Sequence, residues 1–125
     1  MEPIRVLLVD DQCGVRKGLK MRLALEPDIR VAGEAASGDE ALLTVRSHPV
    51  DVVVMDYEMP GMTGIETVEA FERNGVRAAV VILSIHDNQM VRKAASEAGT
   101  RFVAKHEPGE RLISAIREAA SGLHS

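Results

Sequence analysis

Short runs of apolar residues alternate along the chain with longer segments in which apolar positions recur every three or four residues. Three of the short runs are continuously apolar, as expected for strands buried on both faces of a parallel sheet. Each longer segment carries one apolar stripe, which predicts a helix that packs one face against the core. The predicted strands are Ile4–Val9, Ile29–Ala35, Val50–Met55, Ala78–Ser84 and Thr100–Ala104, and the helical stripes include Val15/Leu19/Leu23, Ala41/Val45, Ile65/Val68/Phe71, Val91/Ala94/Ala95/Ala98 and Leu112/Ala115/Ile116/Ala119.

Polar residues and glycines mark the ends of several predicted helices. The segments Ser37–Glu40 and Thr63–Glu66 have the spacing of a capping box, in which a hydroxyl and a carboxylate at a helix start each accept a main-chain N–H. Asp87 is a candidate N-terminal cap for the fourth helix. Gly75 and Gly99 lie where two helices should end, because glycine readily adopts the left-handed conformation common at helix C-termini.

The alternation of five strands with five helices predicts an α/β fold. Parallel strands need right-handed crossover connections, so the helices should cover both faces of one sheet. We therefore predict a doubly wound (βα)5 domain of the flavodoxin-like type, with a central five-stranded parallel sheet in the strand order 2-1-3-4-5. No internal repeat, low-complexity tract or linker interrupts the pattern, so we expect residues 1–125 to form a single domain.

The composition excludes several classes of function. Lys and Arg total 15, Asp and Glu total 19, the net charge is −4 and no basic run is present, so we expect no nucleic-acid binding by this domain itself. No apolar stretch approaches the roughly 18 residues of a membrane-spanning helix, and the N-terminus does not resemble a signal peptide. The single cysteine, Cys13, cannot form an internal disulfide, which favours a reducing, cytoplasmic location.

Acidic residues follow two strands that should be neighbours in the sheet. Asp10 and Asp11 come directly after the first strand, and Asp56 follows the third. Because the carboxyl ends of parallel strands lie at one edge of the sheet, we expect these carboxylates to converge, and a hard cation would relieve their repulsion. Mg²⁺ fits best because it prefers oxygen ligands and keeps several waters. Taken singly, such acids could instead be turn and cap formers, Asp11 above all.

A hydroxyl and an amine lie at the ends of two further strands. Ser84 closes the fourth strand and Lys105 follows the fifth. Either residue alone would be interpreted as an ordinary strand-end or surface residue. Together with the acids they supply a cation, a hydroxyl donor, a metal-binding acid pair and one further carboxylate, which are the groups that phosphoryl transfer requires. Asp56 would then be the nucleophile and would form an aspartyl phosphate.

These segments jointly resemble the receiver domain of two-component response regulators, over about residues 4–120. The resemblance is carried by Val6–Gln12, Val52–Gly64, Val81–Ser84 and Phe102–Lys105. It implies that Asp56 accepts a phosphoryl group from a sensor histidine kinase. It also implies that the domain is a regulatory phospho-acceptor rather than an enzyme, with self-catalysed phosphoryl transfer and hydrolysis of the aspartyl phosphate.

The resemblance further implies a ligand set for Mg²⁺ at the acidic cluster. Asp11 and Asp56 would bind the ion directly, and Asp10 would act through a water molecule. The main-chain carbonyl of Glu58 would complete the protein ligands. Lys105 would pair with an oxygen of the phosphoryl group once that group is attached.

A switch is implied by the same resemblance. Ser84 would hydrogen-bond a phosphoryl oxygen and move inward, which would let Phe102 turn inward and remodel the face formed by the fourth helix, fifth strand and fifth helix. This change would control an output such as transcription. Three features depart from the commonest pattern: Ile85 is bulky, His106 replaces a proline so that no cis peptide is predicted, and the segment Gly99–Lys105 is one residue short.

The segment Leu83–Asp87 and the absence of a Lys-Pro pair resemble the NarL/FixJ subfamily, whose receivers usually precede a helix-turn-helix DNA-binding domain. Too few residues follow Ala120 to form such a domain. The chain is therefore either a stand-alone receiver or part of a longer protein that binds DNA through a C-terminal domain, and we favour the second. Homodimerisation on activation is a further expectation.

Three other functional classes fit the sequence less well than the receiver. A phosphatase of the haloacid-dehalogenase type needs Asp-x-Asp, whereas Asp56–Glu58 supplies a glutamate, and no cap domain is present to enclose a substrate. A flavin carrier needs aromatic stacking and a phosphate-binding loop, and neither glycine-rich motif occurs. A pseudo-receiver that binds partners without phosphorylation is disfavoured by the intact set of acids, serine and lysine.

Overall fold

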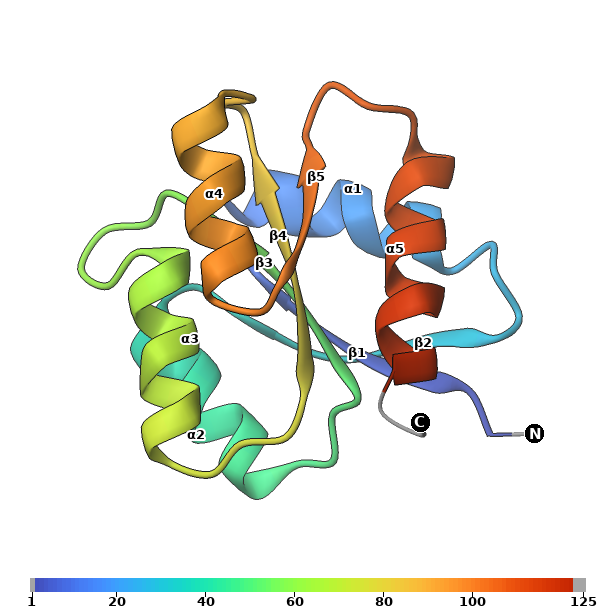
Figure 1. The fold of residues 1–125 in the computed structure, drawn as a ribbon. Helices are drawn as coiled ribbons and strands as arrows, with labels where there is room; N and C mark the ends of the chain where they lie inside the picture. Colours follow the sequence, from blue (N-terminus) through green and yellow to red (C-terminus); the bar gives the residue numbers. More distant parts are fainter. Residues whose placement is uncertain (1, 123–125) are drawn as a thin grey trace.

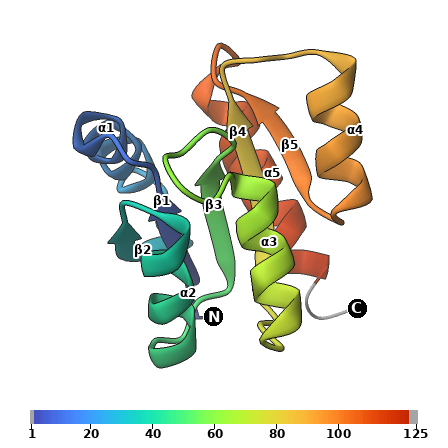
Figure 2. The ribbon, with the colours of Figure 1, turned by 90° about the vertical axis from the view of Figure 1, so that its left-hand side faces the viewer.

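The predicted alternation of strands and helices is present in the computed structural model, which describes residues 2–122. The strands are parallel and lie in the order β2-β1-β3-β4-β5, which reads from left to right in Figure 2. This order confirms the doubly wound (βα)5 fold. In chain order (Figure 1), the elements are β1 (Ile4–Val9), α1 (Cys13–Leu23), β2 (Ile29–Ala35), α2 (Gly38–Ser47), β3 (Val52–Asp56), α3 (Gly64–Arg73), β4 (Ala79–Ser84), α4 (Gln89–Glu97), β5 (Arg101–Ala104) and α5 (Gly109–Gly122).

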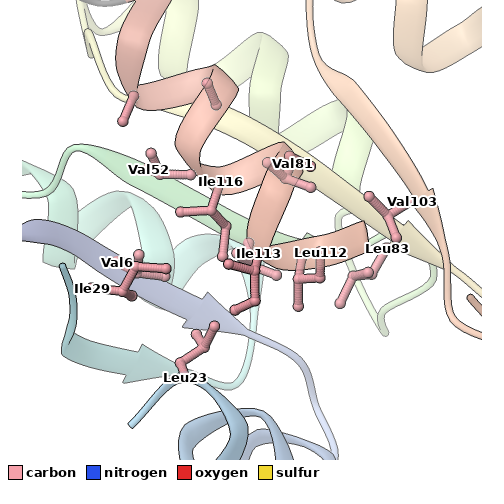
Figure 3. Close-up of a cluster of buried hydrophobic side chains, with 14 of the residues drawn as sticks. Val6, Leu23, Ile29, Val52, Val81, Leu83, Val103, Leu112, Ile113 and Ile116 are labelled. Atoms are coloured by element: carbon pink, nitrogen blue, oxygen red, sulfur yellow. The ribbon is translucent and has the colours of Figure 1, made fainter. Parts of the chain in front are cut away.

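Helices cover both faces of the sheet because successive residues of a strand point to opposite sides. In β1, Val6 and Leu8 join a core cluster with α1 and α5, whereas Leu7 and Val9 join a second cluster with α2, α3 and α4. Figure 3 shows the first cluster, in which Ile116 of α5 lies against the strands. The buried strands leave their carboxyl ends and the following loops as the part of the sheet where polar side chains can gather.

Four strand boundaries differ from the predicted ones. β3 begins at Val52 rather than residue 50, because the Asp51 carboxylate accepts hydrogen bonds from the main chain and side chain of Arg5. β3 also extends to Asp56, which pairs with Leu83 of β4. β4 and β5 each begin one residue later than predicted. β5 begins later because the N–H and the hydroxyl of Thr100 both donate to the main-chain carbonyl of Ala95, which keeps Thr100 in a tight turn after α4.

The capping predictions are confirmed at α3 and half confirmed at α2. Thr63 and Glu66 form a complete capping box, with each side chain accepting the main-chain N–H of the other residue. At α2 the Ser37 hydroxyl accepts the N–H of Glu40, as predicted. The Glu40 carboxylate, however, accepts the N–H of Ala36 instead of that of Ser37.

The prediction that Asp87 caps α4 is wrong. The cap is the next residue, Asn88, whose side-chain oxygen accepts the N–H of Val91 at 3.0 Å. Asp87 instead forms an ion pair with Arg92, one turn into the helix. Either residue type can cap a helix, so the choice depends on which one has the extended backbone that precedes the first turn.

Two glycines end helices as predicted. Gly75 after α3 and Gly99 after α4 have φ angles of +68° and +76°, which place both in the left-handed region. No cis peptide bond occurs in residues 2–122, in agreement with the prediction for Lys105–His106. Over the same residues, no helix combines the length and the apolar character that crossing a membrane would require.

Candidate functional site

Three carboxylates meet at the carboxyl edge of the sheet. β1 and β3 are neighbours with Val9 beside Met55, so Asp10 and Asp56 follow side by side, and Asp11 lies next to them. One carboxylate oxygen from each aspartate lies within 4.8 Å of the other two. Asp10 and Asp56 are buried, whereas Asp11 is exposed. The predicted convergence of the acids is therefore present, and the all-oxygen donor set suits a hard cation such as Mg²⁺.

The Lys105 ammonium lies between two of these acids. Its Nζ is 3.2 Å from Oδ2 of Asp10 and 3.4 Å from Oδ1 of Asp56. The lysine is placed by the β4–β5 pairing, which it extends by donating its main-chain N–H to the carbonyl of Ser84 at 2.8 Å. A positive charge is thus fixed beside Asp56 and is available to a negatively charged group that binds there.

Main-chain groups hold the buried acids in place. The Asp10 carboxylate accepts the N–H of Gln12 at 2.9 Å, and the Asp56 carboxylate accepts the N–H of Glu58 at 3.3 Å. The alternative role of Asp11 as a helix cap is not found, because α1 begins after Gln12 with no side-chain cap. Asp11 is thus left with its carboxylate directed at the cluster and free of a capping role.

Burial raises the pKa of Asp56 above its ordinary value, and the nearby Asp10 carboxylate adds to this effect. The Lys105 ammonium opposes the rise by attraction and hydrogen bonding, and the Glu58 N–H also opposes it. The net direction is upward because desolvation of the carboxylate is the largest contribution. A bound divalent cation would act in the same sense as Lys105 and favour the ionised, nucleophilic form.

We expect the raised pKa of Asp56 to appear in the stability of the metal-free domain. Between the ordinary aspartate pKa and the raised one, the folded state holds a proton that the unfolded state has released. The free energy of unfolding should therefore fall as pH rises from the ordinary aspartate pKa to the raised pKa of Asp56. Above the raised pKa, this group should lower it no further. Asp56→Asn should remove this slope and be more stable than the wild type at neutral pH. Urea denaturation in EDTA at a series of pH values measures the difference, and parallel profiles would contradict it.

Ser84 is placed at the end of β4, the strand beside β3. Its side chain is buried, and its Oγ accepts the N–H of His86 at 2.9 Å. The hydroxyl hydrogen is therefore not used by this bond and can be donated to another acceptor. Ile85, the next residue, has an exposed side chain and begins the loop that leads to α4.

Comparison with known proteins decides the family. The response regulator receiver domain family matches residues 6–117 of the chain. The chain belongs to that family. It is 32% identical over 123 residues to the nitrate/nitrite response regulator protein NarL of Escherichia coli K12, covering 97% of this chain and 56% of that protein. It is 35% identical over 120 residues to the response regulator UvrY of the same strain, covering 95% and 55%.

Solved receiver structures superimpose closely on this receiver domain. The receiver domain of the putative response regulator NarL from Mycobacterium tuberculosis matches with a TM-score of 0.91 and 31% identity, over 98% of this chain and 99% of that one. A LuxR-family response regulator from Aurantimonas gives a TM-score of 0.91 and 32% identity, over 97% and 87%. The relatives agree with the NarL/FixJ-type resemblance, and the receiver spans about half the length of the curated relatives it matches.

Two side-chain contacts of this receiver were not predicted from the sequence. The Glu58 carboxylate pairs with Nε2 of His86, which joins the loops after β3 and β4 across the site. The guanidinium of Arg92 lies over the ring of Phe102, with its central carbon 4.6 Å from the ring centroid. Phe102, the predicted switch residue, is half-buried in β5 and packs against the second core cluster, to which α4 contributes Ala95.

Close packing behind Asp56 requires a glycine at the start of α3. Gly64 donates its N–H to the carbonyl of Tyr57 at 2.9 Å, and a Cβ on Gly64 would lie 2.6 Å from the main-chain oxygen of Asp56. We expect Gly64→Ala to lower the free energy of unfolding by about 1–3 kcal/mol, because backbone must move to accommodate the methyl group. Urea denaturation measures this loss.

Gly18 provides the matched control for this substitution. A Cβ on Gly18 of α1 would meet nothing within 4 Å, so Gly18→Ala should be neutral or stabilising by up to about 1 kcal/mol through helix propensity. Equal stabilities of the two alanine variants would contradict the close contact behind Asp56.

Proposed function

We propose that this receiver is a phospho-accepting switch in which Asp56 takes a phosphoryl group from a sensor histidine kinase in a Mg²⁺-dependent reaction. The observation that carries the proposal is the position of the Asp56 carboxylate. It is buried, lies within 4.8 Å of the carboxylates of Asp10 and Asp11, and has the Lys105 ammonium 3.4 Å away. A nucleophile, a cation site and a fixed positive charge are the groups that phosphoryl transfer needs.

The proposed step transfers a phosphoryl group from a phosphohistidine of the donor kinase to the Asp56 carboxylate. An Oδ of Asp56 forms a bond to phosphorus while the bond from phosphorus to the donor nitrogen breaks, and the electron pair stays on the leaving imidazole. Lys105 pairs with a phosphoryl oxygen, and Ser84 donates its unused hydroxyl hydrogen to another. The domain thus promotes its own phosphorylation and the later hydrolysis of the aspartyl phosphate, and it is not an enzyme acting on a separate substrate.

The acidic cluster is the proposed Mg²⁺ site. Asp11 and Asp56 would bind the ion directly, Asp10 through water, and Glu58 through its main-chain carbonyl. When bound, the ion neutralises charge on the carboxylates and on the phosphoryl oxygens. Asp10 contributes a buried negative charge that is already partnered by Lys105, which keeps the ammonium in place before the phosphoryl group arrives.

The proposed output is a change of the α4–β5–α5 face. Movement of Ser84 toward the phosphoryl group would draw in the loop after β4 and give Phe102 room to turn inward. Phe102 would then leave the guanidinium of Arg92, which also pairs with Asp87. The contact between arginine and ring therefore belongs to the unphosphorylated state in this proposal. Homodimerisation through this face on activation is part of the same proposal.

The wider protein is proposed from the relatives. Their names describe response regulators, and a further relative, 36% identical over 120 residues, is named the transcriptional regulatory protein UhpA of Salmonella typhimurium. We propose that a C-terminal helix-turn-helix domain binds DNA and that this receiver controls transcription through it. A sensor histidine kinase is the proposed donor, and with a single cysteine a reducing cytoplasm is the expected location.

The direct test is phosphorylation by a small-molecule donor. The chain is incubated with acetyl phosphate, with Mg²⁺ or with EDTA, and its intact mass is measured. A gain of one phosphoryl group that requires Mg²⁺ supports the proposal. A chain that gains no mass with Mg²⁺, and that binds no beryllofluoride, would be a pseudo-receiver and the proposal would be wrong.

A further inference from the structure

The peptide that joins Asp10 to Asp11 is held by a side chain that the proposed function does not use. Nη1 of Arg16 in α1 donates to the main-chain oxygen of Asp10, and its Nε donates to Oε1 of Glu34 in β2 at 3.0 Å. The Arg16 side chain is only 15% exposed. A guanidinium carries several donors in a rigid fork, so one side chain can bond the carbonyl of Asp10, which follows β1, and a carboxylate on β2 at once.

This bond completes the anchoring of Asp10. The main-chain N–H of Asp10 donates to the carbonyl of Ala35 in β2 at 3.1 Å. One oxygen of its carboxylate accepts the N–H of Gln12, and the other accepts a hydrogen bond from the Lys105 ammonium. Arg16 takes the remaining group, the carbonyl. Asp11 differs, because within residues 2–122 its carboxylate has no hydrogen bond or ion pair and its side chain is exposed.

The direction of the Asp11 side chain therefore depends on its backbone. The carbonyl of Asp10 and the N–H of Asp11 belong to one planar peptide group, which also contains the Asp11 Cα. A hydrogen bond that holds the carbonyl oxygen therefore also holds the orientation of this plane. We propose that Arg16 is a positioning residue that holds this peptide so that the Asp11 carboxylate faces the metal site, with Glu34 holding the guanidinium in turn. The inference rests on the proposed function, whose metal site it extends to a supporting layer of residues.

An electrostatic role and a positioning role for Arg16 predict opposite changes in Mg²⁺ affinity when the arginine is removed. A guanidinium near a divalent cation repels it, so a purely electrostatic role for Arg16 predicts that removing the charge strengthens Mg²⁺ binding. A positioning role predicts the opposite, because the freed peptide would let Asp11 leave the cluster. Glu34 offsets the positive charge through its contacts with both Arg16 and Lys20, which makes the electrostatic cost of the arginine small.

The test is the Mg²⁺ affinity of Arg16→Met, measured by isothermal titration calorimetry. We expect the dissociation constant to rise about tenfold, as is usual when a residue that supports a metal ligand is lost. Lys20→Met is the matched control, since it removes the other cation on Glu34 without touching the Asp10 carbonyl, and its affinity should be unchanged or slightly tighter. Saturating Mg²⁺ should restore phosphorylation of Arg16→Met by acetyl phosphate to near the wild-type rate.

The outcomes separate this inference from the function on which it rests. Wild-type or tighter Mg²⁺ binding by Arg16→Met, with a wild type that binds Mg²⁺ and accepts the phosphoryl group, overturns the role of Arg16 alone. A wild type that does neither overturns the proposed function itself. Thermal unfolding in EDTA shows whether the variant folds. If it does not, Arg16→Lys replaces it: one ammonium cannot keep both bonds, so weaker Mg²⁺ binding supports the inference and unchanged binding overturns it.

Discussion

Asp56→Asn is expected to abolish the Mg²⁺-dependent mass gain that acetyl phosphate produces on this chain. The amide has nearly the shape of the carboxylate but lacks the negative charge and the nucleophilic oxygen that attack phosphorus. Asp10 and Asp11 are assigned to the metal site in the proposed function, so neither is expected to take over as the nucleophile. Intact-mass measurement on both proteins, with beryllofluoride binding followed by fluorine NMR, checks the loss.

The control for this loss is a carboxylate outside the cluster. Asp39 is exposed in the first turn of α2, and Asp39→Asn should be phosphorylated like the wild type. A mass gain that persists in Asp56→Asn would show that another residue accepts the phosphoryl group. The variant should also be folded and, in EDTA at neutral pH, more stable than the wild type, so a loss of phosphorylation cannot be ascribed to unfolding.

The position of the acidic cluster was predictable because it depends on chain topology alone. Continuous apolar runs end at Val9 and Met55, and a parallel sheet in the order 2-1-3-4-5 makes these strands neighbours. The acids that follow must then meet at one edge, whatever their rotamers. Ser84 and Lys105 follow from the same reasoning, since β4 and β5 are the next strands outward. The sheet order thus accounts for the fold and for most of the candidate site.

Contacts that depend on long side chains or on a choice between adjacent residues were not predictable. Arg16 has several rotatable bonds, and nothing in the sequence indicates that it turns back to the Asp10 carbonyl rather than into solvent. Arg92 over Phe102 is a similar case. At the start of α4, Asp87 and Asn88 have comparable capping preferences, and the difference of one residue is decided by the backbone conformation of the preceding loop.

The proposed switch requires fixed and movable groups at one edge of the sheet. Asp10 and Asp56 are buried and fixed by main-chain N–H groups, whereas Ser84 is followed by an exposed loop that leads to α4. In the proposed function, Asp10 and Asp56 would stay in place while Ser84 and the loop after it move. The contact of Arg16 with the Asp10 carbonyl holds the acids after β1 from the opposite side, through α1 and β2, whereas Glu58 is joined to the loop after β4 by its pair with His86.

Lys105→Met is expected to slow phosphorylation by acetyl phosphate about a hundredfold without weakening Mg²⁺ binding. The methionine keeps an unbranched side chain but removes the charge 3.4 Å from Asp56, and loss of one preorganised donor at a reacting group commonly costs this much. Removal of a cation should leave Mg²⁺ affinity equal or tighter, which separates this variant from Arg16→Met. In EDTA the free energy of unfolding should fall by about 1–3 kcal/mol, because the buried Asp10 carboxylate loses a partner.

Single-turnover phosphorylation kinetics at saturating Mg²⁺ measure the rate, and Lys93→Met provides the control for loss of a lysine charge. Lys93 lies on α4 with its side chain 77% exposed, so its replacement should leave the rate unchanged. Lys105→Arg tests whether charge alone suffices: the guanidinium keeps the charge but is too broad to occupy the space of a single ammonium between Asp10 and Asp56, so only partial recovery is expected. A wild-type rate in Lys105→Met would mean that the ammonium serves the acids before phosphorylation and has no part in the transfer.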